Sequence, residues 1–226
     1  MTMGVIFDMD GVLIDSETFY FERRMNFFQE LEIDPGSNQI DDYVGKTEAA
    51  IWETLVPEDK SLREELYPKY VDYRKTHPID FAKALRKEVK PLLDFLKKRD
   101  IPLALASSSP AVEIESMLIQ CELTEYFSFV ISGESLKQSK PHPEIYLKAK
   151  QQLDCDFFIA VEDSTIGIKS AKAANIYTAA LKQPMQIDQS EADIQIESLQ
   201  ELEQIVLEKV SELMEIRLYI CASYFD

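Results

Sequence analysis

The segment GVIFDMDG, residues 4–11, gives the first indication of the fold of this chain. Its apolar run, residues 4–7, ends directly at Asp8, Asp10 and Gly11. A short apolar run that stops at charged residues is typical of a buried β-strand, since period-2 or wholly apolar segments of this length fit a sheet interior. We therefore predict a first strand that ends at an acidic turn.

Beyond residue 78 the chain alternates between short apolar runs and longer amphipathic stretches. We predict strands at 102–106, 129–131, 157–161 and 177–180, and helices at 89–99, 111–120, 143–153, 164–174 and 198–214. Wholly apolar strands separated by helices are typical of parallel strands covered on both faces. The predicted fold class is α/β, with a Rossmann-like, three-layer parallel sheet that includes the first strand.

A helical segment without strand patterns separates the first strand from the rest of this sheet. Helices are predicted at 16–32, 41–55 and 61–75, with Pro68 at a bend or boundary because proline removes an interior hydrogen bond. We predict a core domain of residues 1–15 and 81–226, and a helical cap domain of residues 16–80 inserted after the first strand.

The composition excludes several classes of partner. The 226 residues carry 24 basic and 41 acidic side chains, a net charge of −17, which argues against nucleic acids and membranes as partners. No apolar run approaches the roughly 20 residues that span a bilayer, so we expect a cytoplasmic protein, and the acidic surface suits a monomer. Cys121, Cys155 and Cys221 lie too far apart to indicate a disulfide framework or a zinc site. The apolar tail 216–226 has no assignable partner.

Four short polar segments each stand next to a predicted strand or helix start. They are residues 8–11, 107–109, 140–141 and 162–163. In an open parallel sheet, such segments meet beyond the carboxyl ends of the strands. Several carboxylates at one place need a cation, and an all-oxygen set of ligands suits Mg²⁺.

The segments FDMDGVLIDSE, ALASSSP, SKPHPEIY and VEDSTIGI, present in this order, resemble the haloacid dehalogenase superfamily of aspartate-dependent phosphohydrolases. The resemblance covers residues 4 to about 202. It is closest to the branch with a helical cap after the first strand, which holds β-phosphoglucomutase and phosphoglycolate phosphatase. It implies a Mg²⁺-dependent enzyme, a phosphoric monoester hydrolase, with a small phosphorylated metabolite as substrate.

The resemblance assigns roles to four acidic residues. Asp8 would attack phosphorus and form an aspartyl-phosphate, and Asp10 would act as general acid and base. The side chains of Asp8 and Asp163 and the backbone carbonyl of Asp10 would hold Mg²⁺, with Glu162 as a further ligand or a neighbour of one. The alternatives are that Asp8 and Asp10 only cap the strand end or the next helix, and that Glu162 belongs to a solvated acidic loop.

The resemblance also implies how phosphate is bound. The Ser107 hydroxyl and the backbone N–H of Ser108 would hold the phosphate where a helix begins. The alternative for these serines is an ordinary helix N-cap. Lys140 would pair with Asp8 and with the transferring phosphoryl group as a point charge.

In the predicted cap, the loop 43–47 resembles one in which related enzymes hold Gly followed by Arg or Lys. We therefore expect Gly45 and Lys46 to face the substrate, with an ordinary helix-linking turn as the alternative. His77 and His142 are not expected to be catalytic.

We therefore predict a Mg²⁺-dependent phosphatase that acts on a sugar-phosphate type of metabolite through Asp8. The alternative is a phosphosugar mutase, but Tyr20 stands where β-phosphoglucomutase has a histidine, which favours net hydrolysis. A second alternative is a non-catalytic binding or regulatory protein. The presence of Asp8, Asp10, Lys140 and Asp163 argues against it.

Overall fold

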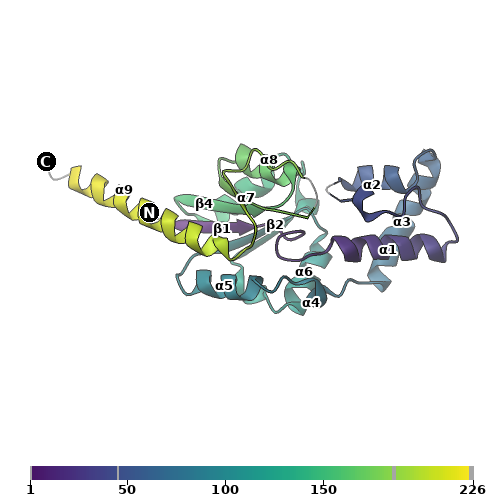
Figure 1. The fold of residues 1–226 in the computed structure, drawn as a ribbon, viewed down its shortest axis with the longest axis horizontal. Helices are drawn as coiled ribbons and strands as arrows, with labels where there is room; N and C mark the ends of the chain where they lie inside the picture. The colour runs from purple at the N-terminus through teal and green to yellow at the C-terminus, as the bar shows by residue number, and fades with distance from the viewer. Residues whose placement is uncertain (1, 45, 185–186, 224–226) are drawn as a thin grey trace. The chain divides into compact units, whose positions relative to one another are not determined.

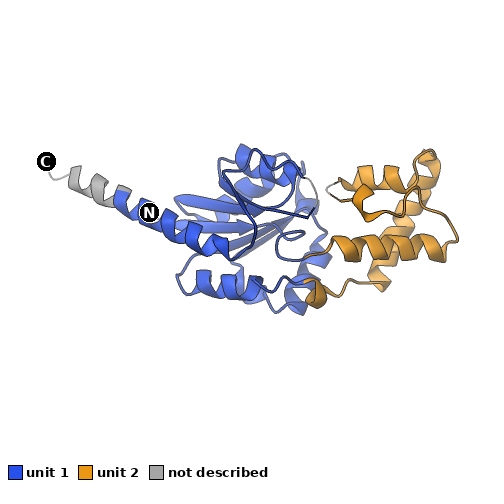
Figure 2. Ribbon diagram, viewed as in Figure 1, with its two compact units in different colours: residues 1–14, 85–226 blue, residues 15–84 orange. Residues whose placement is uncertain are grey.

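The computed structural model divides the chain into two compact units (Figure 2). The first unit is Met1–Ile14 with Leu85–Asp226, and the second is Asp15–Ala84. The second unit contains the segment 16–80 that the sequence predicts as an insertion. The residues that the structure describes are 2–44, 46–184 and 187–223, with side chains described up to 215.

The first unit is built on a six-stranded sheet in the order β3-β2-β1-β4-β5-β6. All neighbouring strands are parallel. The strands are β1 (Met3–Phe7), β2 (Leu103–Ser107), β3 (Phe129–Ser132), β4 (Phe157–Glu162), β5 (Tyr177–Leu181) and β6 (Ile194–Ile196). The predicted α/β fold class with a parallel sheet is confirmed, whereas the sequence analysis missed β6, which is only three residues long.

Helices cover both faces of this sheet, which gives the predicted three layers. Figure 1 shows α7 and α8 on one face and α5 and α9 on the other. The helices of this unit are α5 (Val89–Lys97), α6 (Ala111–Gln120), α7 (Glu144–Leu153), α8 (Thr165–Ala173) and α9 (Glu201–Ser223), with short 3₁₀ turns at Thr124–Tyr126 and Gly133–Ser135. In α5 the apolar side chains recur at helical spacing and are buried, which is why this amphipathic stretch packs as a helix.

The register of the central strands aligns their carboxyl ends. Phe7 of β1 is paired with Leu105 of β2 and with Val161 of β4. The N–H of Asp8 continues the ladder by donating to the Val161 carbonyl at 3.0 Å. The residues that follow β1 therefore lie beside the end of β4.

In its described residues the second unit has helices and turns but no strand, and its core is aromatic. Its elements are α1 (Glu17–Glu30), a 3₁₀ turn (Ile40–Asp42), α2 (Glu48–Leu55), α3 (Lys60–Thr76) and α4 (Phe81–Ala84). The buried cluster includes Phe27, Phe28, Trp52 and Tyr70, with ring centroids 5.2 to 6.1 Å apart in the neighbouring pairs. Burial of these large side chains supplies most of the stabilisation of a unit of this size.

The predicted single helix at 41–55 is wrong at its start. A 3₁₀ turn ends at Asp42, and α2 begins only at Glu48. Thr47 has an extended backbone, and its hydroxyl accepts the N–H of Ala50 at 3.3 Å. A threonine that caps a helix in this way starts a new helix rather than continuing an earlier one.

Pro68 was predicted at a bend or boundary, but it lies inside α3. The residue is exposed, whereas Leu66 and Tyr70 of the same helix are buried in the aromatic core. Proline cannot bond the carbonyl of Glu64 four residues earlier, but on an exposed face that carbonyl can bond water. Packing of the buried face thus maintains the helix across the proline.

We expect Pro68→Ala to stabilise the second unit, because alanine restores the missing N–H in a helix interior. The free energy of unfolding should rise by about 1 to 3 kcal/mol. Thermal or urea unfolding measures the change, with Ser61→Ala as a control at another exposed position of α3. An equal or lower stability of Pro68→Ala would mean that the proline is favourable where it stands.

Candidate active site

The carboxyl edge of the sheet collects the polar residues that the sequence analysis singled out. Asp8 directly follows β1, Ser107 ends β2, Glu162 ends β4, and Asp163 is the next residue. Parallel strands bring all of these ends to one edge, where open α/β sheets bind their ligands. Lys140, from the segment before α7, reaches the same edge.

Lys140 lies at the centre of this edge. Its ammonium donates to Asp8 Oδ1 at 2.6 Å, to Glu162 Oε1 at 2.6 Å and to the Ala106 carbonyl at 3.0 Å. Its side chain is 4% exposed, and that of Glu162 is 0% exposed. All three N–H donors of the lysine therefore have acceptors, which is the condition for burying such a charge at acceptable cost.

The titration of these groups follows from burial and from their mutual charges. The pKa of Asp8 is raised to about 7: burial is the largest cause, the charges of Glu162 and Asp10 add to it, and the charge of Lys140 opposes it. For Lys140, burial lowers the pKa, but Asp8 and Glu162 outweigh it and leave the pKa above its ordinary value. One cation thus faces an excess of carboxylates, so the site favours the addition of positive charge.

Gly11 allows the acidic residues to crowd together after β1. Its φ is +75°, and a Cβ at this position would lie 1.9 Å from Asp163 Oδ2. Glycine is therefore required both for the backbone conformation and for the close approach of the carboxylate. The backbone of Asp163 is fixed from another side by Gln189, whose Nε2 donates to the Asp163 carbonyl at 2.6 Å.

The three serines after β2 have different surroundings. Ser107 is buried, and its hydroxyl accepts the N–H of Ser109 at 3.0 Å. Ser108 is exposed, and Ser109 donates from its hydroxyl to Asp10 Oδ2. Pro110 occupies the N-cap position of α6 without a side-chain hydrogen bond. The alternative of a serine that caps this helix is therefore wrong.

The residues at this edge fit a divalent metal ion. Asp8, Glu162 and Asp163 each offer a carboxylate oxygen, and these three atoms lie within 4.8 Å of one another. Mg²⁺ prefers oxygen ligands, and its charge would balance the excess of carboxylates. The donor chemistry of the site thus agrees with the expected cofactor.

The sequence did not reveal that Tyr146 contacts this site, nor which contact Ser109 of the predicted segment 107–109 makes. Tyr146 is fully buried in α7 and donates from its hydroxyl to Glu162 Oε1 at 2.6 Å. Ser109 contacts Asp10. The hydroxyl of a buried tyrosine usually has a hydrogen-bond partner, so Tyr146 could have been expected to contact a polar group. The partner itself comes from β4 and is not apparent from the sequence around Tyr146.

The residues predicted to read the substrate belong to the second unit. Lys46 is exposed, and its Nζ donates to Thr54 Oγ1 at 2.9 Å. Gly45 lies outside the described residues. Tyr20 lies beside two arginines of α1, with the Arg23 guanidinium 5.3 Å from its ring centroid. His77 stacks on Tyr73 in the same unit.

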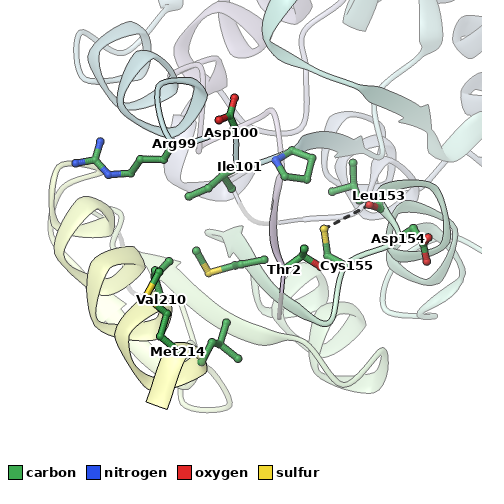
Figure 3. Close-up of a pocket in the computed structure, with 12 residues that line it drawn as sticks. Thr2, Arg99, Asp100, Ile101, Leu153, Asp154, Cys155, Val210 and Met214 are labelled. Carbon is green, nitrogen blue, oxygen red and sulfur yellow. Dashed lines mark hydrogen bonds between the residues drawn. The ribbon is translucent and has the colours of Figure 1, made fainter. Parts of the chain in front are cut away.

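A separate cavity of about 490 Å³ lies in the first unit (Figure 3). Its lining includes Met3, Pro102 and Cys155, which begin or precede β1, β2 and β4, so it lies at the amino edge of the sheet, away from the carboxylates. Burial raises the pKa of the Cys155 thiol, and most of the lining is apolar. Its lining carries Arg99 but also Asp100 and Asp154, so the charge of this cavity does not favour an anionic phosphate. Among the described residues, none of the helices is long and apolar enough to cross a membrane.

The geometry agrees with a comparison of the sequence with known families. The family described as "Haloacid dehalogenase-like hydrolase" matches residues 5–181. The chain belongs to this family. The resemblance drawn from the four motifs is thus confirmed, and the parallel sheet with its carboxylate edge is that of a haloacid dehalogenase-like hydrolase.

Individual members of the family are similar over most of the chain. Hexitol phosphatase B of Escherichia coli (strain K12) is 29% identical over 88% of this chain and 94% of its own length. The phosphorylated carbohydrates phosphatase of Thermotoga maritima is 33% identical over 76% of this chain and 82% of its own length. The structure of β-phosphoglucomutase from Clostridium difficile, at 21% identity, shares the fold with a TM-score of 0.74 over 95% of this chain and 99% of that one. The expected class of enzyme, a phosphoric monoester hydrolase of the haloacid dehalogenase family, is confirmed.

We expect Gly11→Ala to destabilise the first unit through its close contact with Asp163. A positive φ costs alanine about 1 to 2 kcal/mol, and the contact with the carboxylate adds about as much again. In the double variant Gly11→Ala/Asp163→Ala only the cost of φ should remain. Urea unfolding of the two single variants and the double variant measures this coupling. Strictly additive effects would show that Gly11 does not make room for Asp163.

Proposed function

We propose that this haloacid dehalogenase-like hydrolase is a Mg²⁺-dependent phosphatase that acts on a small phosphorylated metabolite of the sugar-phosphate type. The observation that carries the proposal is the buried carboxylate of Asp8, bonded to Lys140 at 2.6 Å and clustered with two further carboxylates. The substrate class is supported by relatives named for hexitol and carbohydrate phosphates.

In the first step, an oxygen of Asp8 attacks phosphorus. A new bond forms between Asp8 and phosphorus, and the bond from phosphorus to the alcohol oxygen breaks. Asp10 gives its proton to the departing oxygen, so that a neutral alcohol leaves. The product on the enzyme is an aspartyl-phosphate on Asp8.

In the second step, water attacks phosphorus and gives its proton to Asp10. The bond from Asp8 to phosphorus breaks, which releases inorganic phosphate and restores both aspartates. Ser107, the N–H of Ser108 and Lys140 hold the phosphoryl oxygens in both steps. The hydroxyl, the N–H and the ammonium stabilise the negative charge that spreads over these oxygens in the transition state.

Magnesium would be held by the side chains of Asp8 and Asp163 and by the backbone carbonyl of Asp10. When bound, it supplies positive charge that lets a carboxylate approach a phosphate dianion. The proposal is supported by the chemistry of the cluster, in which Lys140 is the cation that contacts Asp8 and Glu162. Without a metal, an anionic substrate would meet a site of its own sign.

The second unit serves as the cap in this proposal. Gly45 and Lys46 would face the substrate and bind its leaving alcohol. Substrate choice would then depend on residues of the unit 15–84, and phosphoryl transfer on residues of the first unit.

The test of this function is phosphate release from hexitol phosphates, hexose phosphates, phosphoglycolate and nucleotides, with Mg²⁺ and with a chelator. We expect Mg²⁺-dependent release, fastest with a sugar or sugar-alcohol phosphate. Conversion of glucose 1-phosphate to glucose 6-phosphate without release would instead identify a mutase. Release that is unaffected by the chelator would contradict the metal dependence.

Asp8→Asn should abolish this release, by at least about 10⁴-fold, because it removes the nucleophile. Folding should be retained, since the substitution also relieves the crowding of charge. Asp100→Asn is the matched control, because Asp100 has a φ of 54° that asparagine tolerates and lies before β2, at the other edge of the sheet. Near-normal turnover of Asp8→Asn would exclude the proposed mechanism.

Lys46→Ala should raise KM for the sugar phosphate about tenfold, because a charged hydrogen bond to the leaving group is lost. For p-nitrophenyl phosphate, whose leaving group is generic, KM should change less than about twofold. Lys60→Ala, an exposed lysine of the same unit, is the control. Equal effects on both substrates would remove Lys46 from substrate recognition.

A further inference from the structure

The carboxylate of Glu162 has its hydrogen-bonding capacity filled by protein groups. Oε1 accepts from Lys140 Nζ and from Tyr146 Oη, both at 2.6 Å. Oε2 accepts from the N–H of Asp163 and from the hydroxyl of Ser164, both at 3.3 Å. A carboxylate has about four acceptor positions, and four donors surround this one. The side chain is 0% exposed.

The backbone of α8 fixes the same carboxylate from another side. A Cβ at Gly167 would lie 2.0 Å from Glu162 Oε2 and 2.1 Å from Oε1. The first turn of the helix is itself held in place, because Ser164 accepts the N–H of Gly167 at 3.1 Å. Glu162 therefore packs where only a glycine leaves room, and any rotation toward a metal ion would break several of these bonds.

We propose that Glu162 does not bind the metal ion but positions Lys140, and that Tyr146 and Gly167 hold it for this purpose. The inference rests on the proposed function, because Lys140 needs such positioning only if Asp8 is phosphorylated. A lysine is a point charge on a flexible stem, and its location depends on its acceptors. When Asp8 carries the phosphoryl group and loses its negative charge, Glu162 and the Ala106 carbonyl keep Lys140 in place.

Asp163 differs from Glu162 in ways that suit a metal ligand. It is partly exposed, and its carboxylate lies against Gly11, next to the turn that carries Asp8 and Asp10. The separation of at most 4.8 Å would allow Glu162 to join Asp8 and Asp163 around an ion. Because both carboxylate oxygens of Glu162 already accept hydrogen bonds from protein groups, we assign Glu162 to Lys140. The side chains that bind the metal ion are then those of Asp8 and Asp163.

Calorimetric titration with Mg²⁺ alone, without substrate, tests this assignment. Asp163→Asn should weaken Mg²⁺ binding about 100-fold, because a charged ligand is lost. Glu162→Gln should change the Kd less than about threefold, yet lower kcat about tenfold or more through misplacement of Lys140. Weakening of Mg²⁺ binding by Glu162→Gln to the extent seen for Asp163→Asn would overturn the proposal.

Tyr146→Phe tests the same proposal with a variant that keeps the volume of the core. We expect kcat to fall about fivefold to tenfold at saturating Mg²⁺, with KM and the Mg²⁺ Kd within about twofold of the wild type. Tyr126→Phe is the matched control, because its hydroxyl also donates to a carboxylate, Asp94, at 2.6 Å, but away from the site. A kcat of Tyr146→Phe equal to that of Tyr126→Phe would overturn the role of the hydroxyl.

The phosphatase function and the role of Glu162 can be tested separately. If the wild type released no phosphate from any ester, the proposed phosphatase function would fail. The Mg²⁺ titrations would still decide whether Glu162 or Asp163 is the ligand, since they need no substrate.

Discussion

The carboxyl edge of the sheet depends on the contact of Lys140 with two buried carboxylates. Its ammonium joins Asp8 after β1, the Ala106 carbonyl in β2 and Glu162 at the end of β4. One nitrogen thus ties together the ends of three neighbouring strands. Removal of the lysine would leave two buried carboxylates without an opposite charge, which costs several kcal/mol. In the proposed function, the same charge also holds the phosphoryl group during its transfer.

Two glycines provide the space in which these charges meet. Gly11 admits the carboxylate of Asp163, and Gly167 admits that of Glu162. In both cases the side chain of the acidic residue lies where any other residue would place its Cβ. The lack of a side chain at these two positions therefore determines where each carboxylate can lie.

Much of the first unit could be predicted from sequence, because short apolar strands and amphipathic helices carry strong periodic signals. The helix Ala111–Gln120 has the predicted limits, whereas the three-residue β6 is too short to give a signal. Asp8, Lys140 and Asp163 stand in motifs that place them at one edge. Tyr146, and the contact of Ser109 with Asp10, could not be found in this way, because the partners lie on other elements and depend on the register of the sheet.

Identification of the phosphorylated residue would test whether Asp8 is the nucleophile. The enzyme would be mixed with a rapidly hydrolysed sugar phosphate, quenched in acid within milliseconds and digested for mass spectrometry. The account predicts one phosphoryl group, on Asp8, in the peptide that contains residues 4–11, and none in the Asp8→Asn variant. A phosphoryl group on another residue, or steady turnover without any phosphorylated peptide, would contradict it.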